Sequence, residues 1–193
     1  MIKLQPGDIF CSANPMCLGR AIVFVEKVHS SDNQAEYSHV GAITHGKMVD
    51  EQEILQWAEK AFREGISLEE AVSYEALWTN KRRGFYEAYK GKKVLIGRHE
   101  NMTPEAYVKG WGAVKNLEGK IYAGHRLALF LALPFLAKYI NLGLGVCSEI
   151  GGKLIAGSEI IEGFYWKGKN PDHIADMIHR WKGWHVVSEA VLE

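Results

Sequence analysis

Short runs of strand-forming residues alternate along this chain with longer stretches of helical periodicity. The strand-type runs are bounded by Gly, Pro and polar turn residues, and they are "IFCSA" (9–13), "YSHVGAITHG" (37–46), "AVSYEAL" (71–77), "KKVLIGR" (92–98) and "WHVV" (184–187). Apolar residues recur at helical spacing in residues 17–29, 54–62, 103–114 and 170–181. With no internal repeat and no linker, the chain is expected to form one domain over residues 1–193, with helices inserted between the strands.

The helix boundaries carry recognisable signals. Thr103 followed by Pro104 is a typical helix start, and Asn170-Pro171-Asp172 repeats it. Gly65 is placed to end the helix that contains Trp57.

Charge and cysteine content narrow the functional classes. Twenty-three basic residues balance twenty-three acidic ones, and Lys81-Arg82-Arg83 reads as a solvated turn, so we expect no nucleic-acid partner. Cys11, Cys17 and Cys147 form no CxxC pair, and a site made of Cys11, Cys17 and His29 has no recognised ligand spacing. We therefore expect reduced thiols, no structural metal and no cofactor.

The first residues, "MIKLQPGDIF", contain no secretory signal. A cytoplasmic location is the default expectation, with a phage origin or non-classical export left open.

One apolar run, Leu127–Ala137, is too short for a membrane span, which needs about 20 residues, and it contains Pro134. A buried, kinked helix is the favoured interpretation, and a surface for peripheral lipid contact is the alternative.

Cys147 stands out among the cysteines. It follows Gly143 and Gly145 and precedes a helical segment, so free N–H groups and the positive end of the helix dipole would favour its thiolate. Buried packing remains open for Cys147, because free cysteines are among the most buried residues. It is the favoured interpretation for Cys11 and Cys17.

A nucleophilic thiol needs a base, and His39 is the best placed of the eight histidines. It opens a strand, follows a polar loop and stands between Ser38 and Gly41, so its ring can project from the end of a sheet. A structural or solvated histidine is the alternative.

Several blocks in this order resemble the circularly permuted NlpC-type hydrolases, the YiiX-like group with a papain-like fold. The blocks are "PGDIF" (6–10), "YSHVGAI" (37–43), "YEAL" (74–77) before "KKVLIGR", "GKIY" (119–122) and "VCSEI" (146–150). The chain order His, acid, Cys is that of the permuted members. With this resemblance, the expected fold is α+β, with a small, mostly antiparallel sheet or half-barrel packed against helices. The segments at about 51–70 and 124–144 are insertions relative to that pattern.

The resemblance implies a catalytic triad in which Cys147 is the nucleophile, His39 the general base and then acid, and Glu75 the residue that orients the imidazole. It also implies that Tyr37 lines the cleft or assists the oxyanion site, and that N–H groups at the helix start, by Ser148, meet the developing negative charge. Asp50 and Glu51 are rival acids for orienting His39.

Three functional hypotheses follow. The first is an amide-cleaving cysteine hydrolase, with a peptidoglycan-type peptide as the substrate that the resemblance implies. The second keeps the triad but acts on a lipid or acyl ester, favoured by the Leu127–Ala137 run and the six tryptophans. The third is a non-catalytic binding module. The oligomeric state is left open.

Overall fold

The computed structural model describes residues 2–13, 36–48, 50–76, 79–119, 148–167, 169 and 171–193. The helix expected at 17–29, the run at 127–137, the whole 124–144 insertion, Cys17 and Cys147 lie outside these residues. The strands are β1 (Ile9–Ser12), β2 (His39–Thr44), β3 (Val72–Ala76), β4 (Asn80–Gly84), β5 (Lys93–His99) and β6 (Trp184–Val191). The helices are α2 (Glu51–Glu64), α3 (Phe85–Tyr89), α4 (Pro104–Val114), α7 (Ser148–Ser158) and α8 (Pro171–Arg180), and a 3-10 turn covers Lys115–Leu117.

The described strands form one six-stranded sheet in the order β4-β3-β2-β1-β5-β6. Every neighbouring pair is antiparallel. The connection between β3 and β4, residues 77–79, is too short for the crossover that a parallel pair needs. The expected α+β class with an antiparallel sheet is therefore confirmed.

The basic stretch Lys81-Arg82-Arg83 is a strand, and the expectation of a solvated turn is wrong. It pairs with β3 as β4, and successive side chains point to opposite faces of the sheet. Arg82 bonds the carbonyl of Gly46 and the carboxylate of Glu118, whereas Arg83 bonds Glu75 on the other face. Charge made these residues look like a solvated turn, but both guanidinium groups have defined acceptors, and the acceptor of Arg83 is the buried Glu75.

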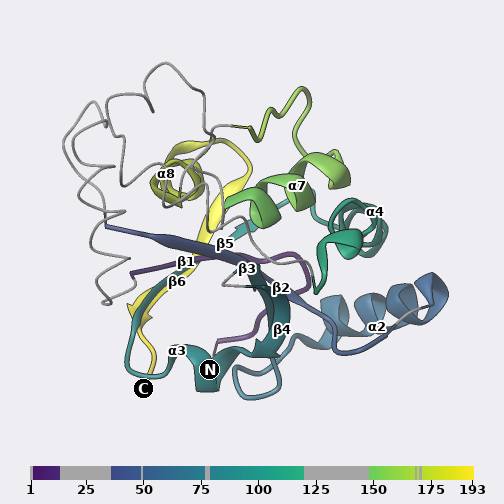
Figure 1. Cartoon of the computed structure of the whole chain (residues 1–193), viewed down its shortest axis with the longest axis horizontal. Helices are drawn as coiled ribbons and strands as arrows, with labels where there is room; N and C mark the ends of the chain where they lie inside the picture. Colours follow the sequence, from purple (N-terminus) through teal and green to yellow (C-terminus); the bar gives the residue numbers. More distant parts are fainter. Residues whose placement is uncertain are drawn as a thin grey trace.

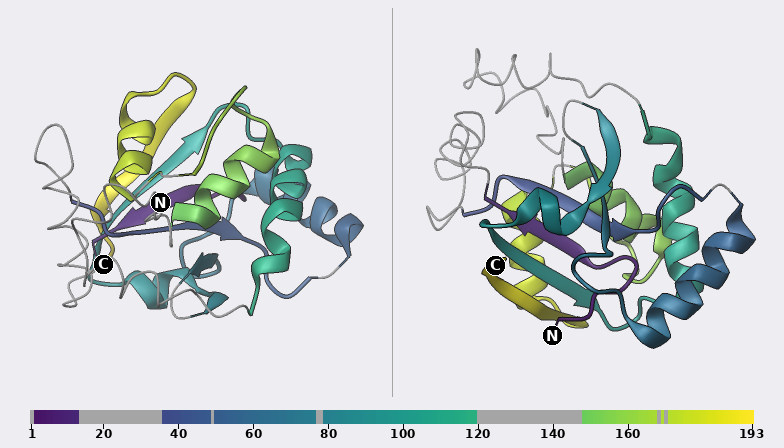
Figure 2. Two further views of the ribbon diagram at one scale, coloured as in Figure 1. Left: turned by 45° about the horizontal axis from the view of Figure 1, so that its top comes forward. Right: turned by 90° about the horizontal axis from the view of Figure 1, so that it is seen from below.

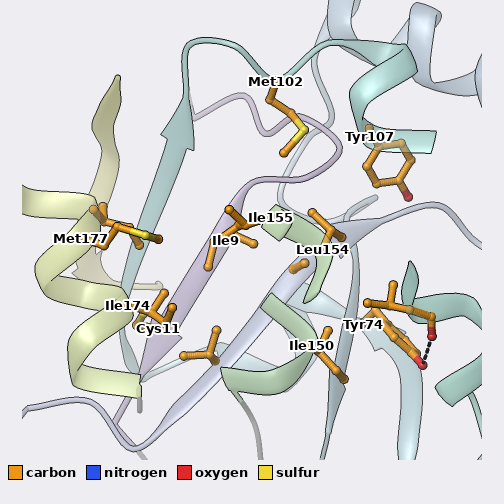
Figure 3. Close-up of a cluster of buried hydrophobic side chains, with 14 of the residues drawn as sticks. Ile9, Cys11, Tyr74, Met102, Tyr107, Ile150, Leu154, Ile155, Ile174 and Met177 are labelled. Atoms are coloured by element: carbon orange, nitrogen blue, oxygen red, sulfur yellow. Dashed lines mark hydrogen bonds between the residues drawn. The ribbon is translucent and has the colours of Figure 1, made fainter. Parts of the chain in front are cut away.

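Each face of the sheet carries its own core. Ile9, Val40 and Tyr74 belong to a cluster with side chains of α4, α7 and α8, and we call this side the α7 face. Figure 3 shows Ile150, Leu154 and Ile155 of α7 in that cluster.

Alternation along each strand sends the next side chains to the opposite side of the sheet, which α3 covers and which we call the α3 face. Phe10, Ile43 and Ile96 lie there with Phe85 and Tyr89. In Figure 1 the sheet is seen between α7 and α8 on one side and α3 on the other.

Helix ends follow the sequence signals. Thr103 Oγ1 accepts from the backbone N–H of Ala106, Gly65 ends α2 with φ 73°, and α8 begins at Pro171. The segment at 51–70, expected as an insertion, contains α2, which buries Ile54 and Ala58 and lies beside α4 (Figure 2).

Trp181 departs from expectation. It follows the end of α8 and is 43% exposed, so the buried stripe of that helix consists of Ile174, Met177 and Ile178 and does not include Trp181.

In the part of the chain that the structure describes, no helix combines the length and apolarity needed to cross a membrane.

Candidate active site

His39 and Glu75 meet on the α3 face. Nε2 of His39 lies 2.6 Å from Oε2 of Glu75, and the side chains are 8% and 0% exposed. The β2–β3 register places Glu75 opposite Gly41, so His39 reaches it diagonally across the strand pair. The sheet thus brings together the two residues predicted as base and orienting acid.

The Glu75 carboxylate accepts from four side chains in all. Oε1 accepts from Ser73 Oγ at 2.8 Å and from Arg83 Nε at 2.5 Å. Oε2 accepts from Tyr89 Oη at 2.6 Å and from Arg83 Nη2 at 2.8 Å, beside its contact with His39. This matches or exceeds the roughly four lone-pair positions that a carboxylate offers.

These contacts fix the charge of Glu75. Burial alone would raise the pKa of its carboxyl, but hydrogen bonds and charge interactions with His39 and Arg83 outweigh burial and hold the pKa well below its usual 4.5. An ionised carboxylate only accepts hydrogen bonds, so the short contact requires a proton on Nε2 of His39. In the neutral imidazole the basic lone pair is then on Nδ1.

The rival acids are engaged elsewhere. Asp50 Oδ1 caps α2 by accepting from the N–H groups of Gln52 and Glu53, and Glu51 forms an ion pair with Lys115 at 2.7 Å. Of the three carboxylates considered from the sequence, Glu75 is the one bonded to His39.

Sequence reasoning missed Arg83 and Tyr89 as parts of this site. In the β3–β4 register Arg83 lies opposite Ser73, and Ser73 is two residues before Glu75, on the same face of β3. Recognition of β4 as a strand would therefore have placed Arg83 on the α3 face with Glu75. Tyr89 comes from α3, a five-residue helix too short for a periodicity signal.

The first turn of α7 lies at the end of the sheet where β2 begins. A side chain at Gly151 would come within 2.9 Å of Cγ1 of Val40, which follows His39. Cys147, which lies outside the described residues, is covalently joined to Ser148 at the start of this helix. α7 packs on the α7 face of the sheet, whereas the His39 side chain lies on the α3 face.

Tyr37 and Ser148 have defined partners. The Tyr37 hydroxyl donates to Oε1 of Glu189 on β6 at 2.8 Å, and burial together with that carboxylate raises the Tyr37 pKa. The Ser148 hydroxyl donates to the backbone carbonyl of Lys169. An oxyanion role for either hydroxyl would require breaking its bond.

Among the described residues, the side chains around Glu75 do not form a set of metal ligands. No three His, Cys, Asp or Glu side chains are grouped as ligands among the residues that the structure describes. Glu75, the natural oxygen ligand here, faces the Arg83 guanidinium with both oxygens, and a cation beside it would be repelled.

A hollow of about 380 Å³ lies between α8 and the segment before it. Its walls include Phe164, Tyr165 and Trp181, with Lys169 and His173 at the side. Aromatic walls of this kind suit an apolar group.

Comparison with known proteins gives one informative likeness. No family model matches the chain, and no curated protein matches it. Among solved structures, the chain is similar to the metalloprotein YiiX from Escherichia coli O157:H7, DUF1105, with a TM-score of 0.54 and 15% identity over 97% of this chain and 98% of that one. At this identity the likeness concerns the fold, and it supports the YiiX-like arrangement expected from the sequence.

Proposed function

We propose that the chain is a cysteine hydrolase with a circularly permuted NlpC-type, papain-like fold, in which Cys147, His39 and Glu75 form the triad. The observation that carries the proposal is the 2.6 Å contact between His39 Nε2 and the buried, ionised Glu75. It fixes one imidazole tautomer and leaves Nδ1 as the base for a thiol.

The chemistry runs in two halves. Nδ1 takes the Cys147 proton, and the sulfur attacks the substrate carbonyl carbon to form a tetrahedral oxyanion that N–H groups at the start of α7 stabilise. The imidazolium then protonates the leaving amine as the C–N bond breaks, which leaves a thioester. His39 next deprotonates a water that attacks the thioester, and the acid and the free thiol are released.

A peptidoglycan-type peptide is the first candidate substrate, from the resemblance of the sequence blocks. An acyl ester or lipid is the second, and the aromatic hollow beside α8 is the observation that favours it. Incubation of the pure protein with muropeptides and with fluorogenic acyl esters compares the two directly.

The decisive test removes the nucleophile. Cys147→Ala should abolish turnover of whichever substrate the wild type cleaves, and iodoacetamide should label Cys147 faster than an ordinary exposed thiol, with slower labelling in His39→Gln. Cys11, which is buried, is the internal control for mass spectrometry. Ordinary labelling of Cys147 that ignores His39, with no turnover, would instead support a binding module.

A further inference from the structure

We infer that Arg83 and Tyr89 are positioning residues that hold Glu75 as an ionised acceptor and thereby keep the proton of neutral His39 on Nε2. The inference deepens the proposed function and rests on it, because the position of this proton matters for catalysis only when His39 serves as the base.

Arg83 donates hydrogen bonds to both oxygens of the Glu75 carboxylate. Its Nε and Nη2 atoms form a fork on Oε1 and Oε2, at 2.5 and 2.8 Å. A carboxylate held at both oxygens cannot rotate freely, so Oε2 stays aimed at the His39 ring. The Arg83 side chain is 31% exposed, so this positive charge comes from the rim of an otherwise buried cluster.

Tyr89 is a further hydrogen-bond donor to the Glu75 carboxylate. Burial and the Glu75 charge raise the pKa of Tyr89 well above 10, so its hydroxyl stays protonated and donates to Oε2 at 2.6 Å. The hydroxyl oxygen of Tyr89 in turn accepts from Arg83 Nη2 at 3.2 Å. The ring packs against Phe10 and Phe85, at centroid distances of 4.9 and 5.2 Å, which fixes the direction of the hydroxyl.

Removal of these donors should reverse the proton arrangement. Burial without Arg83 and Tyr89 favours a protonated Glu75. A protonated carboxyl donates its O–H to Nε2, and the neutral imidazole then carries its own proton on Nδ1. That tautomer has no lone pair on the nitrogen assigned to the thiol.

The experiment reads the tautomer directly. Nitrogen-15 NMR of the imidazoles in a Cys147→Ala background, with the His39 signals assigned by their loss in His39→Gln, should show protonated Nε2 and bare Nδ1 at neutral pH. Arg83→Gln and the double variant with Tyr89→Phe should shift the population toward protonated Nδ1. Arg83→Lys should restore part of the original population, and exposed Lys81→Gln on the same strand is the matched control.

The kinetic readout separates the two proposals. In the presence of Cys147, Arg83→Gln should lower kcat by roughly ten- to a hundredfold with little change in KM, as expected for loss of hydrogen bonds to a charged group. An unchanged tautomer in folded Arg83→Gln and in the folded double variant with Tyr89→Phe would overturn the inference. A shifted tautomer in a protein that Cys147→Ala does not impair would sustain the positioning role and refute the proposed hydrolase.

Discussion

His39 reaches Glu75 across a position that has no side chain. Gly41 lies directly opposite Glu75 in the β2–β3 register, and a Cβ there would stand 3.1 Å from Cβ of Glu75 and 2.7 Å from Cε1 of Phe10. The glycine therefore lets the Phe10 ring and the Glu75 carboxylate occupy neighbouring space beneath His39.

Gly41→Ala should damage both packing and activity. The added methyl must push Phe10 or the β3 backbone aside, and overpacking of this kind costs about 1–3 kcal/mol. We expect a lower denaturation midpoint and a lower kcat/KM together. Gly112→Ala is the control, because a Cβ there meets nothing within 4 Å and should be neutral or slightly stabilising. A fully active, fully stable Gly41→Ala variant would contradict this account.

Glu75→Gln should remove most activity while the fold persists. The neutral amide can turn its NH₂ group toward His39, which moves the imidazole proton to Nδ1, and it no longer balances an imidazolium. We expect kcat to fall by about 10²- to 10⁴-fold. Glu69→Gln, the same change at an exposed turn, should have no effect on the rate. A rate within a few-fold of wild type in Glu75→Gln would place the orienting group elsewhere.

Strand and helix identities were predictable where local signals were strong. The strand containing Val40 and the helix that starts after Thr103 have both periodicity and boundary residues, and the structure confirms them. β4 was missed because Lys81, Arg82 and Arg83 lack apolar alternation, and the partial burial of the two arginines depends on acceptors elsewhere in the fold.

The candidate site, too, was predictable only in part from the sequence. His39 and Glu75 could be singled out from short sequence blocks, but their contact depends on the register of β2 with β3. The choice of Glu75 over Asp50 was beyond the sequence, since Asp50 looks equally acidic until its role as the cap of α2 is known. Tertiary pairing therefore decided which carboxylate faces the imidazole.

Tyr37→Phe tests whether that hydroxyl serves catalysis or the fold. Loss of its hydrogen bond to Glu189 should cost about 0.5–1.5 kcal/mol of stability. Loss of an oxyanion donor would lower kcat by about 10²–10³-fold, and we expect no such decrease. Tyr86→Phe, which removes an exposed hydroxyl hydrogen bond to the carbonyl of Glu193, is the matched control for the substitution.

A hundredfold loss of kcat in Tyr37→Phe with unchanged stability would assign this tyrosine to the reaction. It would also imply that the Glu189 bond breaks when substrate binds.

His45 should make the fold sensitive to mild acid. It is fully buried, with Nδ1 2.6 Å from the Tyr107 hydroxyl and its ring 4.6 Å from that of Trp111. Burial, with a smaller contribution from the Arg82 charge, lowers the pKa of His45 from 6.5 to about 3. The unfolded chain therefore binds a proton between these values that the folded chain does not.

The lowered pKa of His45 makes the folded protein less stable as the pH falls. The contribution of His45 to stability is complete above pH 6.5 and declines as the pH falls toward 3. Glu75, whose pKa is lowered from 4.5, adds its own loss only below about that value. Burial raises the pKa of Asp8 above 3.8, which acts in the opposite direction to His45, so the contribution of His45 is read from the difference between wild type and a His45 variant. Burial also lowers the pKa of His99, which contributes in the same direction.

Urea denaturation at pH 7.5, 6.5, 5.5 and 4.5 checks this prediction. Wild type should lose roughly 2 kcal/mol from His45 across the last two pH units, since a shift of one pKa unit corresponds to about 1.4 kcal/mol. His45→Gln should be less stable at pH 7.5 but should show a flatter pH dependence, because the titrating group has gone. His185→Gln, at an exposed position of β6, should retain the wild-type slope. Equal slopes in wild type and His45→Gln would show that the His45 ring accepts its proton without unfolding, which its apolar enclosure by Trp57 and Trp111 argues against.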